Sequence, residues 1–416
     1  MREMKDSGIA WVGKIPKEWT IMPLYCFYSE RKNKNIFGAE NNLLSLSYGK
    51  VIRKDINTSE GLLPSNYNGY NIVEAGDIII RPTDLQNDKR SLRTGLSKER
   101  GIITSAYIAL KPKNGINSRF YHYLLHTYDI LKVFYNMGNG VRQGLNYDEF
   151  AKLMVYSPSD TEQQRIAEFL DRECGKIDGL KADIQAQIDT LEQYKRSIIT
   201  EAVTHGLNPS APMKDSGIPW VGQFPTHWTK KKGKYILRYM SKPVKQDDGV
   251  ITCFRDGEVT LRSNRREDGF TMADKEIGYQ GVDVGDLVVH GMDGFAGAIG
   301  ISDSRGKASP VLNVLNTKQN KKYIMYYLRS MAYGEVFTAL STGIRVRSCD
   351  LRWNKLAELL YPLPPIDEQN NIVNYIDEQI ARTNEIIADK KLQIETLDGY
   401  KKSLIYEYVT GKKEVV

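Results

Sequence analysis

Basic side chains that could contact a polyanion gather in two regions of the 416-residue sequence. Arginine suits the acceptor edge of guanine and glutamine suits adenine, while lysine and arginine neutralise phosphates. Each of these residues alone is more often a solvated surface charge, so the set carries the prediction. The candidate DNA-binding residues are Arg81, Lys89, Arg90, Arg93, Arg142 and Gln143 in the first region, and Arg255, Arg262, Arg265, Arg266, Arg345 and Arg347 in the second.

Two glycine-bearing basic loops, Gly138–Gly144 and Ser341–Arg347, occupy corresponding places in the chain. Their glycines allow a tight turn whose backbone can approach a ligand closely. Arg142 and Arg345 follow a β-branched residue in both loops, which favours a shared task such as anchoring phosphate, whereas the residues after them differ. The alternative is that both arginines pair with nearby carboxylates and pin the loops.

No catalytic and no metal-binding residues are predicted. The sequence contains no GxxxxGK[ST] phosphate loop, no HExxH and no Asn-Pro-Pro-Tyr tetrapeptide. The glycine-rich run Gly291–Gly300 does not open a clear helix, so it predicts tight turns. His122 and His126 share one helical face, but no third ligand is nearby, which favours a packing face over a metal site.

One long helix is predicted between Ser159 and Gly206. Ser159 and Glu162 form a capping-box pattern at its start, and Gly206 with Pro209 is typical of its end. A seven-residue apolar repeat makes one stripe along such a helix, and the stripe requires a partner. The stripe consists of Leu170, Ile177, Ile184, Leu191 and Ile198, flanked by Ile166, Leu180 and Tyr194.

The partner helix is predicted in the same chain. Glu162-Gln163 recurs as Glu368-Gln369, and the segment that begins at Leu191 recurs from Leu397. We expect the two helices to pack on each other; the alternative is that each lies on its own domain. Gly175 and Gly179 interrupt the first helix with poor helix formers and leave its straightness open. The second stripe consists of Ile380, Ile387, Ile394, Leu397 and Leu404.

A second repeat precedes each helix. Met4–Trp19 matches Met213–Trp228 at eleven of sixteen positions, so the chain is a tandem duplication of a lobe plus a helix. We expect the tryptophans of this repeat to anchor the start of each lobe in its core, with stacking on nucleic acid as the alternative. These tryptophans are Trp11, Trp19, Trp220 and Trp228.

Composition supports two basic lobes. The helical segments 161–205 and 366–416 each carry a net charge of −3, whereas residues 1–160 carry +6 and residues 206–365 carry +7. Two basic lobes suggest a polyanion contacted at two places. The sequence has no run of 18 apolar residues, no signal-peptide core and no CxxC pair, so we expect a cytoplasmic protein without a membrane span.

The duplicated motifs carry a family resemblance. Three motifs, each present twice, resemble the specificity subunit of type I restriction-modification systems. They are the Ile-Pro-x-x-Trp entrance, which has Phe in place of Ile in its second copy, the Glu-Gln helix start and the Leu-x-x-Tyr-Lys-x-Ser helix end. The resemblance covers the whole chain and implies an α+β fold with two β-rich target-recognition domains. It also implies two long helices packed as an antiparallel coiled coil, with internal pseudo-twofold symmetry. The implied domains are 1–160 (first recognition domain), 161–205 (central helix), 206–365 (second recognition domain) and 366–416 (C-terminal helix).

The resemblance also implies partners and chemistry. Each recognition domain would read one half of a bipartite sequence in double-stranded DNA, and the chain itself would be non-catalytic. Two modification subunits that bind S-adenosylmethionine and methylate adenine would dock on it, and restriction subunits that use ATP and Mg would complete the enzyme. No cofactor is expected in this chain.

Two other functional classes stay open on the sequence alone. One is a coiled-coil assembly scaffold that does not bind DNA, which the basic lobes disfavour. The other is a nuclease or methyltransferase in its own right, which the missing motifs disfavour. DNA binding that falls steeply with salt would eliminate the first. Binding of S-adenosylmethionine by the isolated chain would revive the second.

Overall fold

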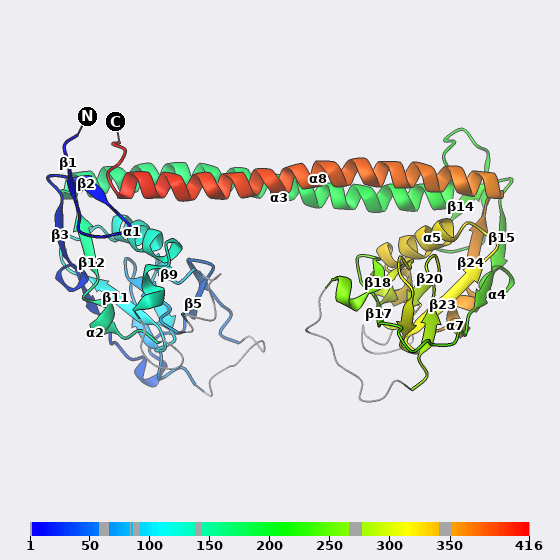
Figure 1. Ribbon diagram of the computed structural model, residues 1–416, viewed down its shortest axis with the longest axis horizontal. Coiled ribbons are helices and arrows are strands. Elements are labelled where there is room, and N and C mark those ends of the chain that lie inside the picture. The colour runs from blue at the N-terminus through cyan, green and yellow to red at the C-terminus, as the bar shows by residue number, and fades with distance from the viewer. Residues whose placement is uncertain are drawn as a thin grey trace. The chain divides into compact units, whose positions relative to one another are not determined.

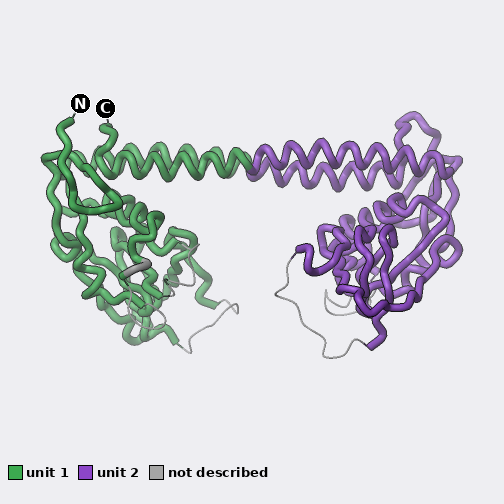
Figure 2. Tube along the Cα trace, in the orientation of Figure 1, with its two compact units in different colours: residues 1–184, 392–416 green, residues 185–391 purple. Residues whose placement is uncertain are grey.

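The chain forms two compact units. The computed structural model describes residues 2–57, 66–83, 85, 92–137, 144–265, 277–340 and 351–415. One unit comprises Met1–Ile184 with Leu392–Val416, and the other comprises Gln185–Lys391 (Figure 2). Each unit contains one lobe of helices and strands together with part of both long helices (Figure 1). Across the described ranges, no helix is long and apolar enough to cross a membrane.

The lobe of the first unit is built on a four-stranded antiparallel sheet in the order β4-β11-β8-β9. Short antiparallel pairs surround it: β1 with β2, β3 with β12, β5 with β6, and β7 with β10. The strands are β1 (Met4–Asp6), β2 (Lys14–Pro16), β3 (Thr20–Pro23), β4 (Tyr28–Glu30), β5 (Leu44–Ser47), β6 (Lys50–Arg53), β7 (Asn71–Val73), β8 (Ile78–Ile80), β9 (Thr94–Leu96), β10 (Gly101–Ile103), β11 (Ile108–Pro112) and β12 (Met154–Ser157), and the helices are α1 (Ser118–Ile130) and α2 (Tyr147–Phe150).

The lobe of the second unit has a sheet of the same design, in the order β16-β23-β20-β21. Its antiparallel pairs are β13 with β14, β15 with β24, β17 with β18, and β19 with β22. The strands are β13 (Met213–Asp215), β14 (Gln223–Pro225), β15 (Thr229–Lys232), β16 (Leu237–Tyr239), β17 (Ile251–Cys253), β18 (Val259–Leu261), β19 (Gln280–Val282), β20 (Leu287–His290), β21 (Ile299–Ile301), β22 (Gly306–Ala308), β23 (Leu312–Thr317) and β24 (Leu360–Leu363), and the helices are α4 (Gly233–Ile236), α5 (Lys321–Tyr333), α6 (Val336–Ala339) and α7 (Trp353–Glu358).

The two long helices are α3 (Asp160–His205) and α8 (Ile366–Val409). Both predicted helices are confirmed, and α3 continues through Gly175 and Gly179. Gly206 ends α3 in the left-handed region, with φ of +79°, as the glycine-proline pattern predicts. Ile166, Leu170, Ile177 and Ile198 are buried, but the predicted flanking residues Leu180 and Tyr194 are exposed. A straight helix drifts from a strict seven-residue repeat, so flanking positions rotate out of the apolar face.

Each lobe shares its hydrophobic core with the helices. In the first unit, Trp19 packs in one cluster with Ile166 and Leu170 of α3 and with Leu404 of α8. In the second unit, Trp228 packs in one cluster with Ile199 near the end of α3 and with Ile372 near the start of α8. Trp19 and Trp228 are fully buried, so their predicted anchoring role is confirmed, whereas Trp11 is 37% exposed. Burial against the lobes therefore adds to the stability of both helices.

Candidate nucleic-acid interface

In the first unit, the entrance motif and the helix-start motif meet in one polar contact. The indole Nε1 of buried Trp19 donates to Glu162 Oε2 at 3.0 Å, and the Arg2 guanidinium donates to the same oxygen at 2.9 Å. Gln163 Nε2 donates to the carbonyl of Pro158 at 3.0 Å. Ser159 caps the helix with a 3.4 Å contact from the Glu162 N–H, but the Glu162 side chain turns toward Trp19 and Arg2 instead of completing the capping box.

The second unit repeats this junction with its own residues. Trp228 Nε1 donates to Glu368 Oε1 at 3.0 Å, and His227 Nε2 lies 2.8 Å from Glu368 Oε2. Gln369 Nε2 donates to the carbonyl of Pro364 at 2.9 Å. Hydrogen bonds to a charged acceptor contribute about 1.5–3 kcal/mol when they are shielded from water. The duplicated sequence motifs therefore fix how each lobe is joined to the start of its following helix.

A buried aspartate fixes the corresponding turn in both lobes. In the first unit, Asp77 Oδ2 accepts the Glu74 N–H at 2.8 Å, and Arg31 donates to Asp77 Oδ1 at 3.0 Å. Burial raises the pKa of Asp77, although Arg31 acts in the opposite direction. In the second unit, Asp286 Oδ2 accepts the Asp283 N–H at 2.8 Å. The glycine-aspartate turn predicted from the sequence is thus held by the same hydrogen bond twice.

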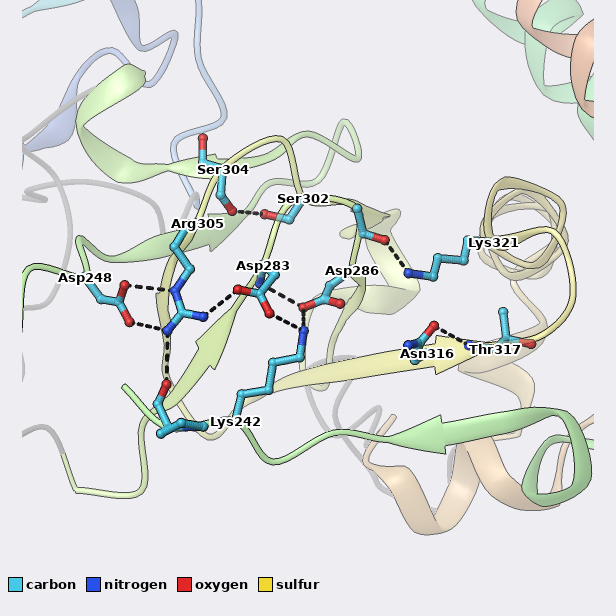
Figure 3. A network of polar contacts seen from close by, with 12 residues as sticks. Lys242, Asp248, Asp283, Asp286, Ser302, Ser304, Arg305, Asn316, Thr317 and Lys321 are labelled. Carbon is cyan, nitrogen blue, oxygen red and sulfur yellow. Dashed lines mark hydrogen bonds and ion pairs between the residues drawn. The ribbon is translucent and has the colours of Figure 1, made fainter. Parts of the chain in front are cut away.

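A larger ion-pair network surrounds this turn in the second unit (Figure 3). Lys242 bridges Asp283 and Asp286, with its Nζ 2.7 Å from Asp283 Oδ2. Arg305 binds Asp248 through two hydrogen bonds of 3.0 and 2.8 Å and also contacts Asp283. Arg305 lowers the pKa of Asp248 to about 2. Lys242 and Arg305 both form ion pairs with neighbouring carboxylates, so this network stabilises the lobe surface.

Only two of the candidate DNA-binding residues in the first region lie within the described chain. Arg81 is half-buried, and its N–H donates to the Arg93 carbonyl at 2.8 Å. Arg93 is fully buried, and its guanidinium donates to the carbonyl of Thr83. The prediction that Arg93 contacts DNA is therefore wrong, because its guanidinium is buried inside the lobe and hydrogen-bonded there. The other candidates, Lys89, Arg90, Arg142 and Gln143, lie outside the described residues.

The structure brings three candidates of the second region together at the β17–β18 hairpin. Arg255 lies in the turn of the hairpin and pairs with Asp293 at 2.9 Å, with 63% of its side chain exposed. Arg262 follows β18, with Nε 3.4 Å from Thr252 Oγ1. Arg265 pairs with Asp256 of the same turn and keeps 38% of its side chain exposed. The remaining candidates, Arg266, Arg345 and Arg347, lie outside the described residues.

The first lobe carries a matching basic hairpin that the sequence reasoning missed. Strands β5 and β6 occupy the place that β17 and β18 have in the second lobe, since each hairpin lies beside its four-stranded sheet. Residues 31–54 hold six Lys or Arg and one Glu. This local excess of positive charge is the sequence feature that could have indicated a basic surface here. The exposed basic residues are Lys32, Lys34, Lys50, Arg53 and Lys54.

A groove of about 1670 Å³ lies in the first unit between α1, the β5–β6 turn and the two long helices. His122 and His126 line it, and within the described chain their buried Nε2 and Nδ1 atoms have no hydrogen-bond partner. Burial lowers the pKa of His122 to about 3 and that of His126 to about 4. Nearby Lys98 and Lys401 act in the same direction. No cluster of three His, Cys, Asp or Glu side chains that could hold a metal ion occurs in the described ranges.

Comparisons with known proteins support the family resemblance. Residues 30–190 match the family described as the type I restriction modification DNA specificity domain. The chain is also 21% identical to the putative type I restriction enzyme MjaX specificity subunit of Methanocaldococcus jannaschii, over 97% of this chain and 96% of that protein. The resemblance to type I specificity subunits is therefore confirmed, and DNA target recognition is the broad function of this family.

A solved structure shares the fold. A chain from a study of complex assembly and conformational transition of the type I R-M system aligns with a TM-score of 0.64 at 12% identity, over 96% of this chain and 99% of that one. The HsdS subunit from Thermoanaerobacter tengcongensis aligns with a TM-score of 0.47 at 13% identity, over 98% and 100% of the two chains. The first alignment confirms the mixed helix and strand content of the fold.

Proposed function

We propose that this chain is the sequence-specific double-stranded DNA-binding subunit of a type I restriction-modification complex. Residues 1–160 and 206–365 act as target-recognition domains, and each reads one half of a bipartite target. The observation that carries this proposal is the duplicated junction, in which Trp19 and Trp228 bind Glu162 and Glu368 through the same hydrogen bond. Two lobes built and joined alike are suited to two similar recognition tasks.

The two long helices connect these tasks. We propose that α3 and α8 pack as an antiparallel coiled coil that relates the two lobes by pseudo-twofold symmetry. Contacts within each unit support this arrangement. In the first unit, Lys401 Nζ lies 2.6 Å from Asp178 Oδ1. In the second, Lys195 Nζ lies 2.8 Å from Asn384 Oδ1. Early residues of α3 thus meet late residues of α8, and late residues of α3 meet early residues of α8.

Basic side chains supply the proposed DNA contacts. Lysine and arginine at phosphates give affinity that depends on salt, and side chains at base edges give sequence choice. Arg255, Arg262 and Arg265 on one hairpin are the contacts that the second lobe offers in its described part. In the first lobe, Arg81 remains a proposed contact. We retain Lys89, Arg90, Arg142, Gln143, Arg266, Arg345 and Arg347 as proposed contacts from the sequence.

The chain assembles with catalytic partners in this proposal. Two modification subunits and the restriction subunits dock on it, and those partners bind S-adenosylmethionine, ATP and Mg. This chain holds no cofactor and performs no chemistry itself. Pseudo-twofold symmetry predicts two equivalent docking sites, so co-purification at saturating partner should give two modification subunits per chain.

Methylome sequencing of cells with and without this chain tests the function directly. We expect methylated adenines in a bipartite motif that disappears when the chain is absent. Exchanging residues 1–160 for those of another specificity subunit should change one half of the motif and leave the other half intact. The rival function, a scaffold without DNA binding, predicts no methylation motif and no salt-dependent binding of any duplex.

A further inference from the structure

Phe37 is the most exposed large apolar residue among those the structure describes, with 93% of its surface accessible. It lies in a short turn, Ile36–Gly38, and Ile36 beside it is 59% exposed. Single exposed apolar residues are common and need no explanation on their own. Phe37, however, also has φ of 58°, in the left-handed region that bulky residues rarely adopt. Folding therefore holds this aromatic ring outward at a cost both in solvation and in backbone conformation.

The turn is fixed from its first side by Asn35. This residue is fully buried, its Nδ2 donates to the Glu40 carbonyl, and its Oδ1 accepts the Glu40 N–H, both at 2.9 Å. The Asn35 N–H donates to the Tyr70 carbonyl at 2.9 Å, which ties the turn to the strand β7 region. The side chain of Asn35 thus closes the loop that presents Phe37.

The turn is fixed from its second side by Glu40. Its Oε1 accepts the backbone N–H groups of Asn41 and Asn42, each at 3.0 Å. Arg100 donates to Glu40 Oε2 at 3.0 Å. These hydrogen bonds, above all that from Asn42, lower the pKa of Glu40, so the carboxylate stays charged in the neutral range. A turn held from both sides keeps the backbone of Phe37 in one place and its side chain at the surface.

The surroundings of Phe37 are basic. Lys32 and Lys34 precede it, and both side chains are exposed. Lys32 contacts Glu30 at 2.8 Å and Lys34 donates to the Gly69 carbonyl at 3.0 Å, which leaves donors on each ammonium group for a further acceptor. An apolar side chain close in sequence to two cations suits a DNA duplex, in which stacked bases lie beside phosphates.

The second lobe has no equivalent aromatic residue. The corresponding turn can be located from a shared backbone hydrogen bond. The Gly281 N–H donates to the Lys242 carbonyl in the second lobe, as the Ile72 N–H donates to the Asn33 carbonyl in the first. Counted from these carbonyls, the position of Phe37 is occupied by Gln246, which is exposed. The exposed ring is therefore a property of the first lobe and does not belong to the shared frame.

We propose that Phe37, with Ile36 beside it, is a wedge that inserts at a base step of the DNA bound by the first lobe, while Lys32 and Lys34 contact the flanking phosphates. This inference rests on the proposed DNA-binding function and deepens it. Insertion unstacks the base pairs and bends the duplex. The bend adds a preference for flexible pyrimidine–purine steps in the first half of the target.

The test uses the full chain, purified with its modification subunits, on a duplex that carries the methylated motif with 2-aminopurine at successive positions of the first half. The wild-type protein should raise 2-aminopurine fluorescence at one step and bend an end-labelled duplex. Phe37→Ala should abolish both signals and weaken binding about fivefold or more, since base–aromatic contacts are worth about that much. Phe37→Leu should retain the bend. Phe37→Gly should lose the signals while its unfolding temperature stays equal or rises, because glycine tolerates the left-handed conformation.

Tyr25→Ala is the matched control, because Tyr25 is an aromatic residue of the same lobe that is 49% exposed and lies in an ordinary 3-10 turn. It should leave fluorescence, bend and affinity unchanged. If Phe37→Ala binds and distorts the duplex like wild type, the wedge is overturned while the proposed function stands. If Phe37→Ala impairs only the recovery of modification subunits, the turn is a protein-docking site and the wedge is likewise overturned. If the wild-type complex binds no duplex, the proposed function fails first.

Discussion

At the scale of single residues, one carboxylate in each unit explains why two distant sequence motifs occur together. Glu162 and Glu368 each accept the indole N–H of a buried tryptophan at 3.0 Å and also bind a basic side chain, Arg2 or His227. The tryptophan lies at the start of a lobe and the carboxylate at the start of the following helix. Neither motif can be satisfied without the other, so both are retained in both halves of the duplication.

We expect Glu368→Ala to lower the free energy of unfolding by about 1–3 kcal/mol, because it leaves the buried Nε1 of Trp228 without an acceptor. The control is Glu358→Ala, whose exposed carboxylate pairs with Lys232 and Lys234 at the surface and should cost less than about 1 kcal/mol. Urea unfolding measures both values, and a double-mutant cycle with Trp228→Phe isolates the coupling. Equal losses for the two variants would rule out a special role for the junction.

The histidines of the groove predict a dependence of stability on pH. The pKa of His122 is lowered to about 3 and that of His126 to about 4, below their ordinary value of 6.5. Between pH 6.5 and about 4 the unfolded chain binds more protons than the folded one, so stability is lost as the pH falls through this range. Asp129, whose pKa burial raises to about 6, and Asp77, whose pKa burial also raises, act in the opposite direction and offset part of this loss.

The double variant His122→Gln/His126→Gln should therefore flatten this loss. Unfolding midpoints at pH 5 and pH 7.5 measure the effect, with Asp129→Asn as the comparison that should steepen it. A wild-type slope in the glutamine variant would show that these two rings do not control the acid sensitivity of the first unit.

At the scale of elements, glycines have opposite roles within and beyond the long helix α3. At Gly175 and Gly179 an added methyl group would contact no other atom within 4 Å. Gly206 is in the left-handed region, and an added methyl group would lie 3.2 Å from the buried ring of Trp228. The interior glycines lower helix stability without a packing benefit, whereas the terminal glycine is required by its conformation.

We therefore expect glycine-to-alanine substitutions at these positions to change the free energy of unfolding in opposite directions. Gly175→Ala should raise the free energy of unfolding by about 1 kcal/mol through helix propensity. Gly206→Ala should lower it by about 1 kcal/mol or more, since alanine is strained at positive φ. Chemical denaturation of the two variants checks the signs. A loss of stability in Gly175→Ala would contradict the argument from helix propensity.

The elements themselves were largely predictable and the site was not. Heptad spacing and the glycine-proline end placed α3 to within about one residue at each end, because period and capping are local properties of the sequence. The start of α8 was also predicted, but the helix ends at Val409, before the predicted end at residue 416. Arg93 was assigned to DNA contact but is buried, because the fate of an arginine depends on neighbours that are distant in sequence, here the carbonyl of Thr83. Phe37 was missed, because its left-handed backbone is imposed by Asn35 and Glu40, which no residue preference for phenylalanine reveals.

At the scale of the whole molecule, the two lobes are more alike in structure than in sequence. Outside the matching motifs the two lobes differ, yet their sheets have the same strand order, β4-β11-β8-β9 and β16-β23-β20-β21. The aspartate turn and the tryptophan junction recur with the same donors and acceptors. Frame positions are constrained by buried hydrogen bonds. The hairpins β5–β6 and β17–β18 have buried residues of their own, but exposed residues such as Lys50 and Arg255 are free to vary. A common frame with different hairpins is what two readers of different half-sites require.

The proposed bipartite target has a gap between its two half-sites. We expect the long helices to set this gap. Inserting four residues near Gln185–Gln187 lengthens α3 by about 6 Å, which is roughly one helical turn. Lys390 of α8 donates to Gln187. A matched four-residue insertion next to Lys390 therefore keeps the apolar stripes of the two helices in register.

DNA rises about 34 Å per turn of 10 base pairs, so 6 Å corresponds to one or two base pairs. Methylome sequencing of cells that carry the double insertion should show both half-sites unchanged and the gap longer by one or two base pairs. The half-sites should persist because the insertion lies far in sequence from the hairpins and loops that are proposed to read them. Altered half-sites with an unchanged gap would refute the idea that helix length controls the spacing. A four-residue insertion in a surface turn such as Asn208–Ser210 should change neither feature, because it adds no length to either helix.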